Sequence, residues 1–136
     1  MAAVDITLLR ILVVEDDLFT REVTIKTLEG LGARQISSAG NGRKALTILQ
    51  EAEWPVDVIL VDLEMPDLNG YEFIKKLRNE FEPPLSDTPV IVVSGHSEKR
   101  DLDRVRGLGV SLFLLKPITA DQALTRINAA MRHKTE

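Results

Sequence analysis

The stretch Val58-Ile59-Leu60-Val61-Asp62 is a run of four apolar residues that ends in an aspartate. A strand buried on both faces of a parallel sheet has this continuous apolar character, whereas a half-buried strand alternates apolar and polar residues. Three further runs have the same character, at residues 11–14, 90–93 and 112–115. Together the four runs predict strands of a parallel β-sheet.

The segments between these runs favour helices. Apolar residues recur at helical spacing within residues 45–52, 73–81 and 123–131, and Thr119 to Gln122 has the pattern of a capping box before the last of them. Residues 17–31 and 97–107 are predicted helices with weaker patterns, and residues 34–38 are a weaker fifth strand. A strand followed by a helix, five times over, predicts an α/β fold with a parallel sheet and helices on both faces. The flavodoxin-like strand order 2-1-3-4-5 suits five such strands.

Composition limits the class of protein. A chain of 136 residues has the length of one domain, and its net charge of −4 gives it no overall attraction to nucleic acid. The absence of cysteine excludes disulfides and thiolate metal sites. No apolar run approaches the roughly 18 residues of a membrane helix, and the N-terminus lacks the basic region of a signal peptide. We therefore expect a cytoplasmic protein.

Charged and hydroxyl residues follow the predicted strands. In an open α/β sheet the ligand site lies at the carboxyl ends of the strands, so these residues are expected to meet. Taken singly, each is better explained structurally: Asp17 as a helix N-cap, Ser94 as a loop serine and Lys116 as a solvated lysine. Their joint position favours a common site, formed by Glu15, Asp16, Asp62, Ser94 and Lys116.

The chemistry of such a site is specific. Neighbouring carboxylates repel one another, and a hard divalent cation such as Mg²⁺ relieves the repulsion. A carboxylate can also attack phosphorus to give an acyl phosphate. The transferred group then needs positive charge around its oxygens, which a metal ion and Lys116 can supply, while Ser94 can donate a hydrogen bond.

Four motifs resemble those of response-regulator receiver domains, the chemotaxis-regulator type included. The segment 11–17 is similar to the acidic motif after the first strand, and 61–66 with Asn69-Gly70 to the phosphorylation strand and its loop. Residues 92–95 and 115–117 resemble the hydroxyl and lysine-proline motifs. The resemblance covers residues 10–132, which implies an N-terminal extension at 1–9, a receiver domain at 10–132 and a tail at 133–136. Residues 1–9 either form a tail or pack beside the first strand.

The resemblance implies a phosphoacceptor and its metal site. Asp62 would accept the phosphoryl group and bind Mg²⁺ (or Mn²⁺). Asp16 would bind the ion directly, Glu15 through water, and Glu64 through its backbone carbonyl. Ser94 and Lys116 would contact the phosphoryl group.

The resemblance also implies a switch and partners. Phe113 would change rotamer on phosphorylation, although an ordinary core phenylalanine fits the same position. The Lys116–Pro117 bond is expected to be cis. Glu64 and His96 would tune dephosphorylation. A sensor histidine kinase or histidine phosphotransfer protein would donate the phosphoryl group. A downstream protein or output domain would bind the face formed by the fourth helix, fifth strand and fifth helix. Such a domain is a signalling switch rather than an enzyme, with no direct binding of nucleic acid or membrane.

Other classes remain as alternatives. A receiver-like protein-binding module that works without phosphorylation would keep the same fold. A haloacid-dehalogenase-type phosphatase would need a second aspartate two residues after Asp62, where this chain has Glu64. A flavodoxin-type flavin binder would need a hydroxyl-rich phosphate loop after the first strand, and the three acidic residues there would repel a flavin phosphate.

Overall fold

Five parallel strands form a single sheet in the order β2-β1-β3-β4-β5, the order predicted from the sequence. The computed structural model describes residues 4–65, 67–95 and 99–135. The strands are β1 (Arg10–Val14), β2 (Gln35–Ala39), β3 (Val58–Asp62), β4 (Val90–Ser94) and β5 (Leu112–Leu115). The weak fifth strand expected at residues 34–38 is thus β2, displaced by one residue. β1, β3 and β4 are almost wholly buried, which explains their continuous apolar runs.

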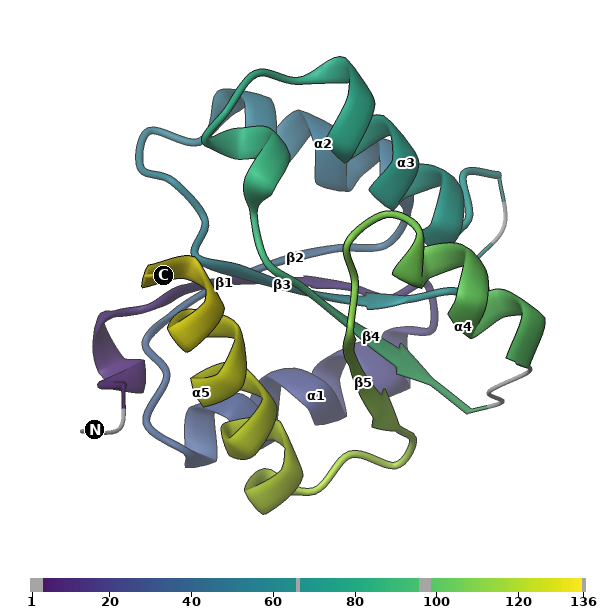
Figure 1. Cartoon of the computed structure of the whole chain (residues 1–136). Helices are drawn as coiled ribbons and strands as arrows, with labels where there is room; N and C mark the ends of the chain where they lie inside the picture. The colour runs from purple at the N-terminus through teal and green to yellow at the C-terminus, as the bar shows by residue number, and fades with distance from the viewer. Residues whose placement is uncertain (1–3, 66, 96–98, 136) are drawn as a thin grey trace.

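Helices cover both faces of the sheet. They are α1 (Leu18–Gly30), α2 (Gly42–Glu51), α3 (Gly70–Glu80), α4 (Lys99–Arg106) and α5 (Ala120–Thr135), with short 3₁₀ turns η1 (Ile6–Leu8) and η2 (Leu85–Asp87). Figure 1 shows α2 and α3 on one face and α1 and α5 on the other, with α4 beside the β4–β5 edge. This is the doubly wound, flavodoxin-like arrangement that the sequence predicts. Among the described residues, no helix has both the length and the apolar character needed to span a bilayer.

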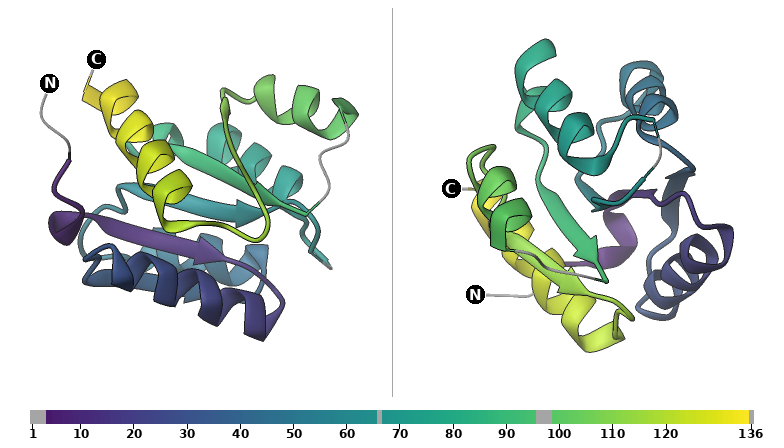
Figure 2. Two further views of the ribbon diagram at one scale, coloured as in Figure 1. Left: turned by 90° about the horizontal axis from the view of Figure 1, so that it is seen from below. Right: turned by 90° about the vertical axis from the view of Figure 1, so that its right-hand side faces the viewer.

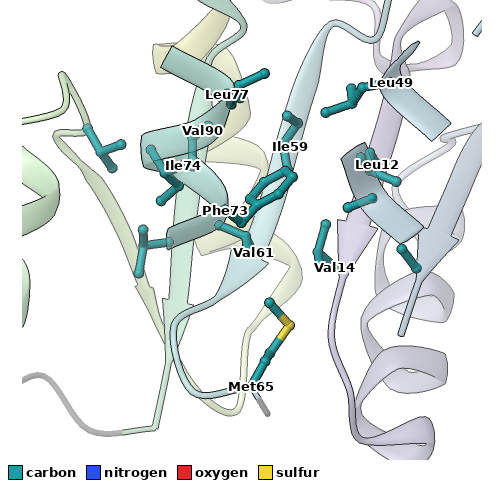
Figure 3. Close-up of a cluster of buried hydrophobic side chains, with 14 of the residues drawn as sticks. Leu12, Val14, Leu49, Ile59, Val61, Met65, Phe73, Ile74, Leu77 and Val90 are labelled. Atoms are coloured by element: carbon teal, nitrogen blue, oxygen red, sulfur yellow. The ribbon is translucent and has the colours of Figure 1, made fainter. Parts of the chain in front are cut away.

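The alternation of side chains along β1 divides the core into two layers. Leu12 and Val14 pack toward α2 and α3, whereas Ile11 and Val13 pack toward α1 and α5. In the first layer the ring of Phe73 on α3 lies over β3 (Figure 3), and its side chain is fully buried. The predicted stripe at residues 123–131 is the buried face of α5 in the second layer.

Polar side chains fix where the helices begin. Asp17 accepts a hydrogen bond from Thr20 N at 2.8 Å, which confirms it as the N-cap of α1. Asn69 and Glu72 form a capping box at the start of α3. At α5, Gln122 N donates to Thr119 Oγ1 at 3.2 Å, the first half of the predicted box.

The N-terminal segment packs on the domain from Val4 onward. Val4 N donates to Asn128 Oδ1 on α5 at 3.1 Å, and Ile6 and Leu9 are buried in the layer beneath α5. Of the two arrangements open for residues 1–9, the described part therefore packs against the fold. In Figure 2, η1 and the last turns of α5 lie opposite the end to which β1 and β3 point.

Candidate functional site

The strands deliver Glu15, Asp62, Ser94 and Lys116 to one edge of the sheet. Asp62 and Ser94 are the last residues of β3 and β4, and Glu15 and Lys116 directly follow β1 and β5. Three of the side chains are buried, with exposed fractions of 4% for Glu15, 6% for Asp62 and 3% for Ser94. Polar groups with so little contact with water need partners within the site.

Lys116 is the partner of two of these acids. Its Nζ lies 2.6 Å from Glu15 Oε1 and 3.2 Å from Asp62 Oδ2. Burial alone would lower the pKa of Lys116, but the hydrogen bonds and negative charge of Glu15 and Asp62 outweigh burial and raise this pKa. The backbone of Lys116 is tied to the neighbouring strand, because its N–H donates to Ser94 O at 2.9 Å. The Lys116–Pro117 peptide bond is cis, as expected.

Backbone amides fix the orientation of both buried carboxylates. Glu64 N donates to Asp62 Oδ1 at 3.1 Å, so each oxygen of Asp62 has a donor. Asp17 N donates to Glu15 Oε2 at 3.2 Å. The Asp62 carboxylate is therefore held in one orientation rather than free to rotate.

Glu15, Asp16 and Asp62 form a cluster suited to a hard cation. One carboxylate oxygen from each lies within 4.8 Å of the others. Asp16 is the exposed member of the three. Partial desolvation raises the pKa of Asp16, and the neighbouring Glu15 raises it further. Mg²⁺ binds carboxylate oxygens and keeps several waters, and this cluster offers carboxylate oxygens with one exposed member.

The loop after β3 is packed against the strand end that carries Asp62. A methyl group added at Gly70 would lie 2.6 Å from Leu63 Cα and would collide with the backbone carbonyl of Asp62. Gly70 N also donates to Leu63 O at 3.1 Å. The first turn of α3 thus sits directly on the end of β3, which only a residue without a side chain allows.

The other residues predicted for the site differ in exposure. A methyl group added at Gly95 would meet no atom of the described residues within 4 Å. Glu64 is exposed, and Phe113 on β5 is half-buried, with the Arg106 guanidinium 5.3 Å from its ring centroid. His96 lies outside the described residues.

Sequence reasoning did not identify Arg21 as part of the site. Its Nη1 donates to the backbone carbonyl of Glu15 at 2.9 Å and so supports the acidic loop from α1. Arg21 lies one turn inside a helix whose apolar pattern is weak, and no motif marks it. Its contact with a main-chain carbonyl depends on the fold rather than on a residue pattern.

Comparison with known protein families agrees with the resemblance seen in the sequence. The model of the response regulator receiver domain matches residues 11–128. The phosphate regulon transcriptional regulatory protein PhoB of Escherichia coli is 38% identical over 125 residues, which cover 90% of this chain and 52% of that protein. A probable histidine kinase 2 of Oryza sativa subsp. indica is 30% identical over 93% of this chain and 13% of its own length. The chain thus spans about half or less of these curated relatives.

Solved structures show the same similarity. The chemotaxis protein CheY4 of Vibrio cholerae superposes with a TM-score of 0.79 at 26% identity, over 90% of this chain and 98% of that one. A response regulator receiver protein from Pseudomonas putida gives a TM-score of 0.78 at 28% identity, over 89% and 96% of the two chains.

Proposed function

The chain belongs to the response regulator receiver family, and from this membership we propose that Asp62 accepts a phosphoryl group from a phosphohistidine. The observation that carries the proposal is the position of the Asp62 carboxylate. It is buried at a strand end, oriented by Glu64 N, and paired with Lys116 beside two further acids. A carboxylate fixed in this way is a suitable nucleophile for phosphorus.

Glu15, Asp16 and Asp62 would hold Mg²⁺ (or Mn²⁺), with the backbone carbonyl of Glu64 as a further ligand. The fit rests on the three carboxylate oxygens that lie within 4.8 Å of one another. When bound, the ion supplies positive charge to the phosphoryl oxygens.

Phosphoryl transfer exchanges one bond for another. An oxygen of the Asp62 carboxylate forms a bond to phosphorus while the bond from phosphorus to the donor imidazole nitrogen breaks. Lys116 Nζ, which contacts Asp62 Oδ2, then lies where it can neutralise a phosphoryl oxygen. The Ser94 hydroxyl, at the end of the adjacent strand, donates to another phosphoryl oxygen.

A phosphodonor protein would dock beside the acidic loop. Leu18 and Phe19 begin α1 directly after the acidic residues, and they are 58% and 75% exposed. Exposed apolar side chains beside the acidic residues offer contact area to a sensor histidine kinase or a histidine phosphotransfer protein. The phosphohistidine chemistry defines the class of this donor protein.

Phosphorylation would change the face formed by α4, β5 and α5. Ser94 would move toward the phosphoryl group, and the half-buried Phe113 on the neighbouring strand would follow inward. Leu115, which is 59% exposed, lies on this face. The change in population of two states would thus reach a downstream protein or an output domain.

The test is to incubate the protein with acetyl phosphate and Mg²⁺ and to record its intact mass. Wild type is expected to gain one phosphoryl group, stable in acid and labile in base, and to gain none in EDTA. Asp62→Asn is expected to gain none. The matched control is Asp67→Asn, which changes an exposed aspartate of the same loop at a φ of 62° that asparagine tolerates. This control is expected to be phosphorylated like wild type.

A failed reaction would lead to a second measurement. Beryllofluoride, which imitates a phosphoryl group on aspartate, is titrated with Mg²⁺ and followed by NMR. Shifts at Asp62, Ser94 and Lys116 would keep the proposal and would show that acetyl phosphate is an unsuitable donor. Failure in both experiments would favour the protein-binding module that works without phosphorylation.

A further inference from the structure

On its outer side β2 has no neighbouring strand among the described residues. β2 is the terminal strand of the sheet and pairs with β1. Ala39 O accepts from Glu15 N at 3.0 Å and therefore faces β1. Because main-chain groups alternate in direction along a strand, those of Gln35 and Ser37 also face β1, whereas those of Ile36 and Ser38 point outward.

A groove runs along this edge between β2 and α2. Two hollows of about 490 and 470 Å³ adjoin one another, and Ile48 of α2 lines both. Trp54, which is 61% exposed, lines the first hollow. The small side chain of Ser37 lines the same hollow. The groove therefore combines an apolar floor with a strand edge.

The charge of the groove is opposite to that of the whole protein. Five cationic side chains line the two hollows and only two acidic ones do, although the chain has a net charge of −4. Arg34 is at one end, and Arg43 and Lys44 are at the other, all exposed. A negatively charged ligand is attracted to this groove and repelled by most of the remaining surface.

We propose that β2 docks an extended acidic segment of a partner protein as an additional strand. Main-chain bonds form with Ile36 and Ser38, acidic side chains approach Arg34, Arg43 and Lys44, and apolar ones contact Ile48 and Trp54. Exposed edge strands are commonly protected by lysine, proline or a bulge, and Gln35-Ile36-Ser37-Ser38-Ala39 contains neither lysine nor proline. The site lies on the sheet edge opposite β5, so it serves a second partner.

An NMR titration of the isotope-labelled full chain tests this site. The probe is a seven-residue peptide that alternates valine with aspartate or glutamate, and its counterpart carries lysine in place of each acid. The acidic peptide is expected to shift the amide signals of Ile36, Ser38 and Ile48, more weakly as salt is added. Binding of both peptides alike, or shifts confined to other elements, would refute the proposal.

Three variants separate the two kinds of contact. Ser38→Pro removes an outward N–H without removing a bond to β1, and is expected to weaken binding about fivefold. Arg43→Glu with Lys44→Glu leaves the main chain of β2 unchanged and is expected to weaken peptide binding about tenfold. The matched control, Lys26→Glu with Lys75→Glu, makes the same change of charge at exposed lysines of α1 and α3 and is expected to have little effect. Equal weakening by the control would show non-specific attraction, and tighter binding of a single-stranded oligonucleotide at the same amides would assign the groove to nucleic acid instead.

Discussion

Gly70 lies where a side chain would collide with the strand end that carries Asp62. A methyl group there would meet Leu63 Cα at 2.6 Å as well as the carbonyl of Asp62. Because backbone atoms would have to move, Gly70→Ala is expected to lower the free energy of unfolding by about 3 kcal/mol. The same movement would displace Asp62 and slow its phosphorylation. Urea denaturation and the rate of the acetyl phosphate reaction measure the two effects.

Gly30→Ala is the control for this substitution. A methyl group at Gly30, the last residue of α1, would meet nothing within 4 Å. Alanine also favours helix, so this variant is expected to be as stable as wild type or more stable by up to about 1 kcal/mol. Equal urea midpoints for the two variants would show that the loop after Asp62 yields easily.

At the scale of elements, Arg78 joins three parts of the chain. From α3 its Nε donates to Leu108 O at 3.0 Å, and its Nη1 donates to Ser86 O and Thr88 O at 3.0 and 2.8 Å. Arg78→Met would leave three carbonyls without this donor, and we expect a loss of about 3 kcal/mol in the free energy of unfolding. Lys76→Met, which removes an exposed pair with Glu80 on the same helix, should cost no more than about 0.5 kcal/mol. A similar cost for both would mean that water replaces the Arg78 bonds.

α4 is held on the body by a stacked arginine. The guanidinium of Arg104 lies 3.9 Å from the ring centroid of Tyr71 on α3, and the next residue of the helix, Val105, is fully buried. Arg104→Ala is expected to speed hydrogen exchange at the Val105 amide about threefold, since an exposed cation–π contact contributes about 0.7 kcal/mol. Arg100→Ala, at a side chain 78% exposed, is expected to leave that rate unchanged. If both variants exchange alike, the stacking does not hold α4.

Apolar runs identified four of the five strands, including β5, which lies at the sheet edge and is only partly buried. β1, β3 and β4 are buried on both faces, so their apolar runs identify them without further information. The apolar pattern of α1 was weaker because only Thr24 and Leu28 of this helix are buried. Its apolar residues Leu18, Phe19 and Val23 are exposed. β2 was harder to predict because it lies at the sheet edge and contains exposed polar residues, so it has no continuous apolar run.

At the scale of the whole molecule, the topology explains why the site could be predicted from strand ends. Parallel strands bring their carboxyl ends to one edge, so the residues after four apolar runs had to be close together. The 2.6 Å contact between Lys116 and Glu15 was not predicted, because it depends on how far the β5 loop reaches across the sheet. Arg78 was missed for a similar reason: its partners are loop carbonyls, which no residue pattern encodes.

The carboxylates gathered at one edge of the sheet repel one another, and this repulsion lowers the stability of the whole fold when no cation is bound. Mg²⁺ bound only by the folded state would raise the free energy of unfolding, by about 2.7 kcal/mol at a hundredfold excess over its Kd. In EDTA, Asp16→Asn is expected to be at least as stable as wild type, because it removes one of three carboxylates within 4.8 Å. On addition of Mg²⁺ the free energy of unfolding of Asp16→Asn should rise by less than that of wild type, whereas that of Asp67→Asn should rise by the same amount. Urea midpoints with and without Mg²⁺ measure this, and equal gains for all three proteins would mean that the ion binds away from Asp16.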